Sequence, residues 1–196
     1  MAEKIYLIRH GLTESNKNNI YAGWNEESLC QEGINALLEI GKKLKEFKIE
    51  KIYSSPIRRA IQTAEVLNSF LNKAVEIEEN LKEMKMGPWE GLSEEVVAEK
   101  FPKEWRIWNL EPSELKLDGR ETLKELHLRA LEAVKKISNL SDSLKILAVT
   151  HVALIRVLII YYNNLSMDDY RKIDVPNSAV YLFDNKVQKK KIIRLL

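Results

Sequence analysis

Arg9, His10 and Gly11 follow the apolar run at residues 5–8 and form the segment of this chain best suited to chemistry. Such a run predicts a buried parallel strand, and ligands of α/β proteins bind beyond the carboxyl ends of such strands. A neutral imidazole at this point can attack phosphorus as a nucleophile. The planar guanidinium beside it can hold phosphate oxygens through paired hydrogen bonds. The tripeptide therefore indicates a site for a phosphate ester.

Two later segments also place polar side chains directly after predicted strands. Residues 54–59 follow the predicted strand at 49–53, and Thr150 and His151 follow the predicted strand at 146–149. Because parallel strands end at the same edge of a sheet, we expect these side chains to converge with His10. Arginines and a second histidine would stabilise the charge on a transferring phosphoryl group.

The motifs in these segments occur in a definite order along the chain. The sequence reads Arg-His-Gly-Leu-Thr-Glu-Ser-Asn at residues 9–16, Ser-Ser-Pro-Ile-Arg-Arg-Ala-Ile-Gln-Thr-Ala at 54–64, Gly-Pro-Trp-Glu-Gly at 87–91 and Thr-His at 150–151. This order resembles the histidine phosphatase superfamily, in its phosphoglycerate mutase-like branch, over most of the chain. The resemblance implies an α/β fold, a three-layer α/β/α sandwich with a mostly parallel mixed sheet. It also implies a phosphomonoesterase that works through a phosphohistidine on His10.

The resemblance further assigns roles to the other catalytic candidates. Arg9 and Arg58 would bind the phosphate, Glu83 would protonate the leaving oxygen, and His151 would steady the transferred phosphoryl group. Arg58 and Arg59 are adjacent, so on a helix they point about 100° apart and only one can face the site. The resemblance to the family favours Arg58 for that place and leaves Arg59 to orient the groups around it.

Five further residues are expected to support the ligand. Asn16 and Thr13 can donate to phosphate or brace the loop after the first strand. Ala22 and Gly23 can offer backbone amides to the rest of the ligand. Val152 is also expected to bind the phosphate. Val152 and Ala153 stand where the family usually has a pair of glycines. The approach of the backbone to the ligand can therefore differ here.

Other residues with reactive or charged side chains fit structural roles better. Cys30 has Ala36 six positions later, where a cysteine-dependent phosphatase needs an arginine, so we expect it to take no part. His127 falls on the apolar stripe of a predicted helix, and Thr122 fits a helix start. Arg120 could touch an anionic substrate. The three histidines lack metal-ligand spacing and no Asp-x-Asp motif is present, so we expect no metal and no other cofactor.

Two alternatives to a phosphatase remain open at this point. One is phosphoryl transfer of the phosphoglycerate mutase type. The compact segment at residues 86–91 favours a phosphatase, because mutases of this family usually carry a larger insertion there. The other is a phospholigand-binding module without turnover, which the complete set of candidate site residues disfavours. The sequence leaves the alcohol half of the substrate open among phosphoserine, phosphosugars, phosphoglycerates and the nucleotide-loop precursor of cobalamin.

Apolar spacing predicts the elements that must position these residues. Helices are expected at 34–44, 57–71, 123–137 and through 154–159, and strands at 5–8, 49–53, 75–77 and 146–149. A closing hairpin is expected from 179–183 and 187 onward. Strands and helices alternate, which predicts a mixed, mostly parallel sheet with helices on both faces. Residues 84–117 hold three tryptophans and three prolines, and we expect this least regular segment to form a lid that sets specificity.

Composition limits the class of protein and its partners. The 196 residues suit a single domain, and 31 basic against 29 acidic residues give a net charge of +2, too balanced to favour nucleic acid or a membrane as partner. The lysines at 186–191 suit a solvated edge strand. Without a signal-peptide pattern, a cytoplasmic location is expected. A small-molecule phosphate ester is the expected partner, and a homodimer remains open.

Overall fold

A six-stranded mixed sheet forms the centre of the computed structural model, which describes residues 4–139, 145–184 and 192–196. The strands lie in the order β3-β2-β4-β1-β5-β6. The first four are parallel, whereas β5 runs antiparallel to β1 and β6 antiparallel to β5. Their bounds are β1 (Lys4–Arg9), β2 (Lys51–Ser54), β3 (Val75–Ile77), β4 (Lys145–Thr150), β5 (Val180–Asp184) and β6 (Ile192–Arg194).

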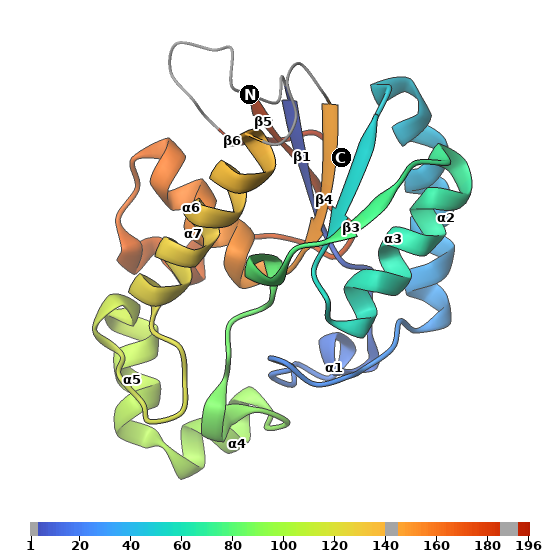
Figure 1. The fold of residues 1–196 in the computed structure, drawn as a ribbon. Helices are drawn as coiled ribbons and strands as arrows, with labels where there is room; N and C mark the ends of the chain where they lie inside the picture. The colour runs from blue at the N-terminus through green and yellow to red at the C-terminus, as the bar shows by residue number, and fades with distance from the viewer. Residues whose placement is uncertain (1–3, 140–144, 185–191) are drawn as a thin grey trace.

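Helices cover both faces of this sheet because its central strands are apolar on both sides. Ile5 and Leu7 of β1 pack with the residues of α6 (Leu123–Asn139) and α7 (Val152–Asn163). Tyr6 and Ile8 point to the opposite face and pack with α2 (Gln31–Leu44) and α3 (Arg58–Leu71). Figure 1 shows the two helix pairs on opposite sides of the strands. The predicted three-layer α/β/α fold is confirmed.

Short elements connect these layers. The helix α1 (Glu14–Lys17) follows β1. Short 3-10 helices occur at η1 (Lys45–Phe47), η2 (Glu79–Leu81), η3 (Gly87–Trp89), η4 (Pro112–Glu114) and η5 (Met167–Lys172). β5 pairs with β6, as expected for a closing hairpin, and β6 forms one edge of the sheet. The lysine-rich stretch 186–191 falls in a part of the chain that the structure does not describe.

The segment at residues 84–117 is more regular than its sequence suggests. It contains two helices, α4 (Glu94–Lys100) and α5 (Pro102–Leu110), of which the first is capped by the Ser93 hydroxyl. Trp89 is fully buried and meets Trp105 and Trp108 edge to face at ring separations of 6.3 and 6.1 Å. These rings join the apolar cluster of α6 and α7. The prolines begin short helices here instead of preventing them.

Strand register brings the three polar segments to one edge of the sheet. Arg9 at the end of β1 lies opposite Thr150 of β4, and Ser54 at the end of β2 lies opposite Val149. The amide of His10 continues the ladder by donating to the Thr150 carbonyl at 2.9 Å. The predicted convergence of the carboxyl ends of these strands is therefore present.

No helix among the described residues is both long enough and apolar enough to cross a membrane. The most apolar helix, α7, has 12 residues, compared with about 20 for a spanning helix.

Candidate active site

A cleft of about 330 Å³ opens at the carboxyl edge of the strands. Its walls come from the end of β1, residues 15–23, α3, residues 83–86, the helices α4 and α5, the first turn of α7 and residues 170–177. Of the residues that the sequence proposed, seven line this cleft: Arg9, His10, Asn16, Ala22, Gly23, Glu83 and Val152. The other three proposed residues, Thr13, Arg58 and His151, do not line the cleft, and the reason differs for each.

The imidazole of His10 is buried and held in one orientation. Its Nδ1 lies 2.7 Å from the carbonyl oxygen of Gly11, and the Nε of Arg59 donates to its Nε2 at 3.2 Å. A carbonyl can only accept, so Nδ1 carries the proton and Nε2 offers a lone pair. Burial, and then the charges of Arg59 and Arg9, lower the pKa of His10 well below its usual value. The ring is therefore neutral at physiological pH.

Arg59, and not Arg58, faces the site. Arg58 is exposed and does not line the cleft, whereas only 1% of the surface of Arg59 is exposed. Both belong to the first turn of α3, and the face of that helix is set by the hydroxyl of Thr63, which accepts from the Gly11 amide at 3.0 Å. Arg59 precedes Thr63 by four residues and so shares its face. The prediction for Arg58 was wrong because it placed the wrong side of the helix toward the strands.

The remaining donors of Arg59 hold the loop opposite. Its terminal nitrogens donate to the carbonyl oxygens of Ala22 at 2.6 Å, Gly23 at 2.8 Å and Asn25 at 3.1 Å. The Asn25 side-chain oxygen accepts as well, at 3.1 Å. Gly23 lets the loop pack closely on residues 84–86, since a Cβ there would lie 2.9 Å from the side chain of Met86. The loop thus presents carbonyls to Arg59, whereas the sequence suggested amides directed at a ligand.

Arg9 retains hydrogen-bonding capacity toward the cleft. One terminal nitrogen donates to the carbonyl of Val175 at 2.6 Å. Its Nε is buried and has no hydrogen-bond partner in the described parts of the chain. Burial lowers the pKa of Arg9 to about 10, so the guanidinium stays charged at neutral pH. A ligand anion would supply the missing acceptor.

His151 lies behind the cleft wall, against His10. The two ring centroids are 5.1 Å apart. Its Nε2 lies 2.8 Å from the hydroxyl of Ser55, which accepts from the Ile57 amide and is free to donate to the ring. Nδ1 is buried and unpaired within the described residues. Burial and the Arg59 charge hold the pKa of His151 well below its usual value.

The carboxyl group of Glu83 is buried at the start of α7. Its Oε1 accepts from the amide of Met84 at 2.7 Å and from the amide of Ala153 at 3.2 Å. Burial raises the pKa of Glu83, against the opposing effects of those amides and of Arg59 and Arg9. This environment favours the protonated form, in which the group can act as an acid.

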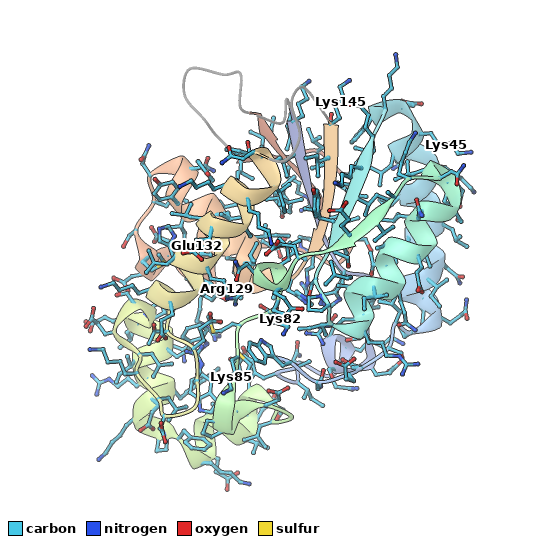
Figure 2. The ribbon with its side chains drawn as sticks, in the orientation of Figure 1. Lys45, Lys82, Lys85, Arg129, Glu132 and Lys145 are labelled. Atoms are coloured by element: carbon cyan, nitrogen blue, oxygen red, sulfur yellow. The ribbon has the colours of Figure 1, made fainter. Side chains whose placement is uncertain are left out.

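The segment that carries Glu83 is held by Arg129, which sequence reasoning missed. Arg129 binds both carboxylate oxygens of Glu121, at 2.9 and 2.8 Å. It also donates to the carbonyls of Asn80 and Lys82, each at 2.9 Å, and to that of Glu83 at 3.3 Å. Figure 2 shows Arg129 on α6 next to Lys82. Arg129 therefore fixes the backbone on which the candidate acid stands.

The loop after β1 is braced from both sides. Thr13 is fully buried and caps α1 by accepting from the Asn16 amide at 3.3 Å, so it supports the loop rather than lining the cleft. Asn177 donates to the carbonyls of His10 and Gly11 at 3.1 and 3.2 Å, and to the side-chain oxygen of Asn16 at 2.7 Å. No local signal in the sequence marks Asn177, because its partners are more than 160 residues away.

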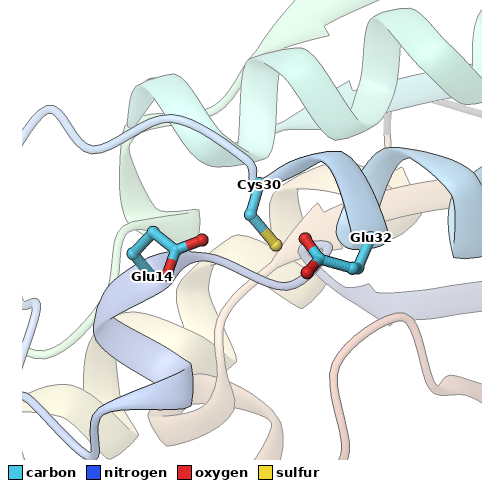
Figure 3. A group of neighbouring side chains, drawn as sticks. All are labelled: Glu14, Cys30 and Glu32. Atoms are coloured by element: carbon cyan, nitrogen blue, oxygen red, sulfur yellow. The ribbon is translucent and has the colours of Figure 1, made fainter.

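Glu14, Cys30 and Glu32 form a group that could in principle hold a metal ion (Figure 3). Their ligand atoms lie within 4.8 Å of one another. The Nζ of Lys17 already contacts the two carboxylates, at 3.0 Å for Glu14 and 2.8 Å for Glu32. An ammonium group thus supplies the positive charge here, and Cys30 occupies the N-cap position of α2 without a capping hydrogen bond from its side chain.

The remaining candidates lie away from the cleft wall. His127 of α6 stacks on Tyr161 at 5.0 Å, and Thr122 caps α6 by accepting from the Glu125 amide. Arg120 is buried between two tryptophan rings, 4.2 Å from that of Trp108, and does not line the cleft. The cleft instead contains Arg156, whose position as the one charge inside an apolar helical run was the available signal.

We expect the protein to lose stability as the pH falls below about 6.5. The folded chain keeps His10 and His151 neutral, whereas exposed imidazoles of the unfolded chain take up protons from that pH downward. Each histidine then lowers the free energy of unfolding by up to about 1.4 kcal/mol per pH unit. Urea unfolding between about pH 7.5 and about pH 5.5 measures this slope.

A double variant, His10→Gln with His151→Gln, isolates the histidine contribution. Glu83 acts in the opposite sense, since its raised pKa gives a stabilisation that is complete below the usual value of 4.5 and is lost as the pH rises through the folded-state pKa. Both proteins share that effect, so it cancels in the difference. The wild type should lose more stability on acidification than the double variant, and equal slopes would contradict the two buried neutral rings.

Comparisons with known proteins place this geometry in a family. Phosphoserine phosphatase 1 of Hydrogenobacter thermophilus is 23% identical over 192 residues, covering 98% of this chain and 91% of that protein. A 2,3-bisphosphoglycerate-dependent phosphoglycerate mutase of Bacteroides fragilis is 29% identical over 217 aligned positions, covering 93% of this chain and 86% of the mutase. The structure titled Bacillus stearothermophilus YhfR has the same fold, with a TM-score of 0.90 at 24% identity, over 100% of this chain and 96% of that one. Residues 5–195 match the histidine phosphatase superfamily (branch 1), and the chain belongs to that family.

Proposed function

We propose that this chain is a phosphomonoesterase that hydrolyses small phosphorylated metabolites through a phosphohistidine on His10. The observation that carries the proposal is the fixed tautomer of His10, in which Gly11 binds the Nδ1 proton and Nε2 remains unprotonated. A nucleophilic nitrogen between two guanidinium groups suits attack on a phosphate ester. The cleft, at about 330 Å³, is at the small end of the range for ligand pockets and suits a metabolite.

The reaction proceeds in two steps. In the first, Nε2 of His10 forms a bond to phosphorus, the ester P–O bond breaks, and the Glu83 carboxyl group gives its proton to the leaving alkoxide. In the second, the oxygen of a water molecule bonds to phosphorus, the bond between phosphorus and Nε2 of His10 breaks, and the Glu83 carboxylate takes a proton from the water. This releases inorganic phosphate and restores both groups. The raised pKa of Glu83 supports this alternation between acid and base.

Three groups stabilise the phosphoryl oxygens during both steps. Arg9 and Arg59 supply positive charge, and Arg9 has a buried Nε without a partner among the described residues. His151 does not line the cleft, but it lies against His10, which would carry the phosphoryl group. It would act as a neutral donor, because Ser55 can donate to its Nε2 and thereby leave the proton on Nδ1, which is unpaired among the described residues. Preorganised donors of this kind act mainly on the charge that develops in the transition state.

Phosphoglycerate mutase activity is the second candidate, favoured by the 29% identity to a mutase. That alignment is longer than the 196 residues of this chain, so the mutase contains residues without a counterpart here. This difference supports the phosphatase. The segment at residues 84–117 sets specificity in our proposal, because Met84, Met86, Glu94 and Trp108 line the cleft. A panel of phosphomonoesters, with and without 2,3-bisphosphoglycerate, separates release of phosphate from isomerisation.

Trapping the intermediate tests the proposed reaction. With p-nitrophenyl phosphate and EDTA present, the wild type should show turnover and a phosphoenzyme that is labile in acid and stable in base. His10→Gln should show neither, because it removes the nucleophile and keeps a polar side chain of similar size. Circular dichroism checks that the variant is folded. A phosphoenzyme in the folded variant, or wild-type phosphate release from it, would refute the role of His10.

The neighbouring arginines provide a matched pair of variants. Arg59→Lys keeps the charge but cannot contact His10 and the 22–25 loop together, so we expect kcat to fall about 10²- to 10³-fold. Arg58→Lys should stay within about twofold of the wild type, since that side chain is exposed. Steady-state kinetics on p-nitrophenyl phosphate measure both. Similar losses in the two variants would mean that the helix, and not Arg59 itself, is responsible.

Glu83→Gln tests the proton donor because it removes the acid and keeps the shape. The leaving group of an aliphatic ester is a strongly basic alkoxide. The kcat of Glu83→Gln on such an ester should fall about 10²-fold or more, within the range for general acid catalysis. The leaving group of p-nitrophenyl phosphate is a weakly basic anion, so kcat on this ester should fall far less. Measuring both esters with one preparation controls for misfolding. An equal loss on the two would assign the proton to another group.

A further inference from the structure

The cleft carries charged groups besides those that contact His10. Tyr21, Glu94, Arg156, Tyr170 and Arg171 line the cleft and make no hydrogen bond to His10, and we call this set the leaving-group end. Whatever remains of the substrate beyond the phosphate must meet these side chains. Their charges therefore bear on the chemical class of the alcohol.

Two of the three charged groups at the leaving-group end neutralise each other. Arg171 donates to the carboxylate of Glu94 at 3.3 Å and to the hydroxyl of Tyr21 at 3.3 Å. The Tyr21 hydroxyl in turn donates to Glu94 at 3.1 Å. This closed group leaves one positive charge, that of Arg156, which has no carboxylate within ion-pair distance among residues 4–139, 145–184 and 192–196.

Arg156 is fixed in position before any ligand binds. Its Nε donates to the carbonyl of Ile173 at 2.8 Å, and its guanidinium lies over the ring of Tyr170 at 5.2 Å. Its charge contributes to the lowered pKa of Arg9. A guanidinium held at Nε and stacked on a ring loses little freedom when its terminal nitrogens bind an anion.

Arg156 belongs to the helix whose Ala153 amide binds Glu83, and this bears on the length of the alcohol. Ala153, whose amide binds the Glu83 carboxyl group, and Arg156 lie three residues apart on α7 and both line the cleft. Residues at this spacing share a helix face and are separated by about one turn, ~5 Å along the axis. Since Glu83 acts at the ester oxygen, a group bound by Arg156 lies a short carbon chain away from it.

We infer that Arg156 binds a carboxylate on the alcohol half of the substrate, so that the preferred substrates are phosphate esters of short hydroxy acids. The inference rests on the proposed function, because it assumes that an ester occupies the cleft. A carboxylate fits better than a second phosphate, since the leaving-group end offers one unpaired positive charge and a phosphate dianion carries about two. The planar guanidinium also matches the two oxygens of a carboxylate.

Two esters that differ only in the carboxylate provide the test. O-phosphoserine and O-phosphoethanolamine share the phosphate, the carbon chain and the amine. Arg156→Gln should lower kcat/KM for O-phosphoserine about 10- to 100-fold, the value of a hydrogen bond to a charged group. O-phosphoethanolamine and p-nitrophenyl phosphate should change by no more than about twofold. 3-Phosphoglycerate, which has a carboxylate and no amine, should lose activity as O-phosphoserine does.

Arg106→Gln serves as the control for loss of one positive charge, because Arg106 is exposed on α5 outside the cleft. It should leave all four esters unchanged. Equal losses on all esters in Arg156→Gln would overturn the inference, as would no loss on O-phosphoserine or a loss confined to bisphosphates. If the wild type hydrolyses p-nitrophenyl phosphate but shows no preference for the carboxylate esters, only this inference fails. If it hydrolyses no ester and forms no phosphoenzyme, the proposed function fails too.

Discussion

The contact between the buried guanidinium of Arg59 and the imidazole of His10 is the interaction on which the site depends. One planar group reaches the nucleophile with Nε and the 22–25 loop with its terminal nitrogens. Its position is set by α3, which also holds the Gly11 amide through Thr63. The end of β1, the helix α3 and the 22–25 loop thus meet at Arg59. Their relative positions fix the arrangement of side chains around a bound phosphate.

Burial of that site moves two different groups toward the same neutral state. It lowers the pKa of His10 and raises the pKa of Glu83. A nucleophile must lose its proton and a general acid must keep one, so a single dry environment prepares both at one pH. The guanidinium groups of Arg9 and Arg59 strengthen the effect on the histidine and weaken it on the carboxyl group. The balance between burial and positive charge therefore decides how well Glu83 holds its proton.

The sheet and its four long helices could be predicted because their apolar residues repeat with clear periods. The helices α4 and α5 could not, since their stability comes from packing of Trp89 and Trp108 on distant parts of the chain. The choice between Arg58 and Arg59 was open to sequence reasoning. Arg59 lies four residues before Thr63 and eight before Leu67, on the buried stripe of α3. Asn177 and Arg129 act through backbone atoms of remote segments, and the sequence carries no local pattern for such contacts.

The neighbours of β1 in the sheet have a consequence for how the site comes into being. β1 lies between β4 and β5, so it pairs with two strands that come much later in the chain. Thr150 and Asn177, the backbone partners of its strand and loop, follow His10 by more than 130 residues. Until those later residues have been made, β1 cannot pair in the sheet, and His10 lacks the neighbours that complete the phosphate site. A chain that ends before β4 therefore lacks both sheet neighbours of β1, and the site is incomplete until Asn177 has been made.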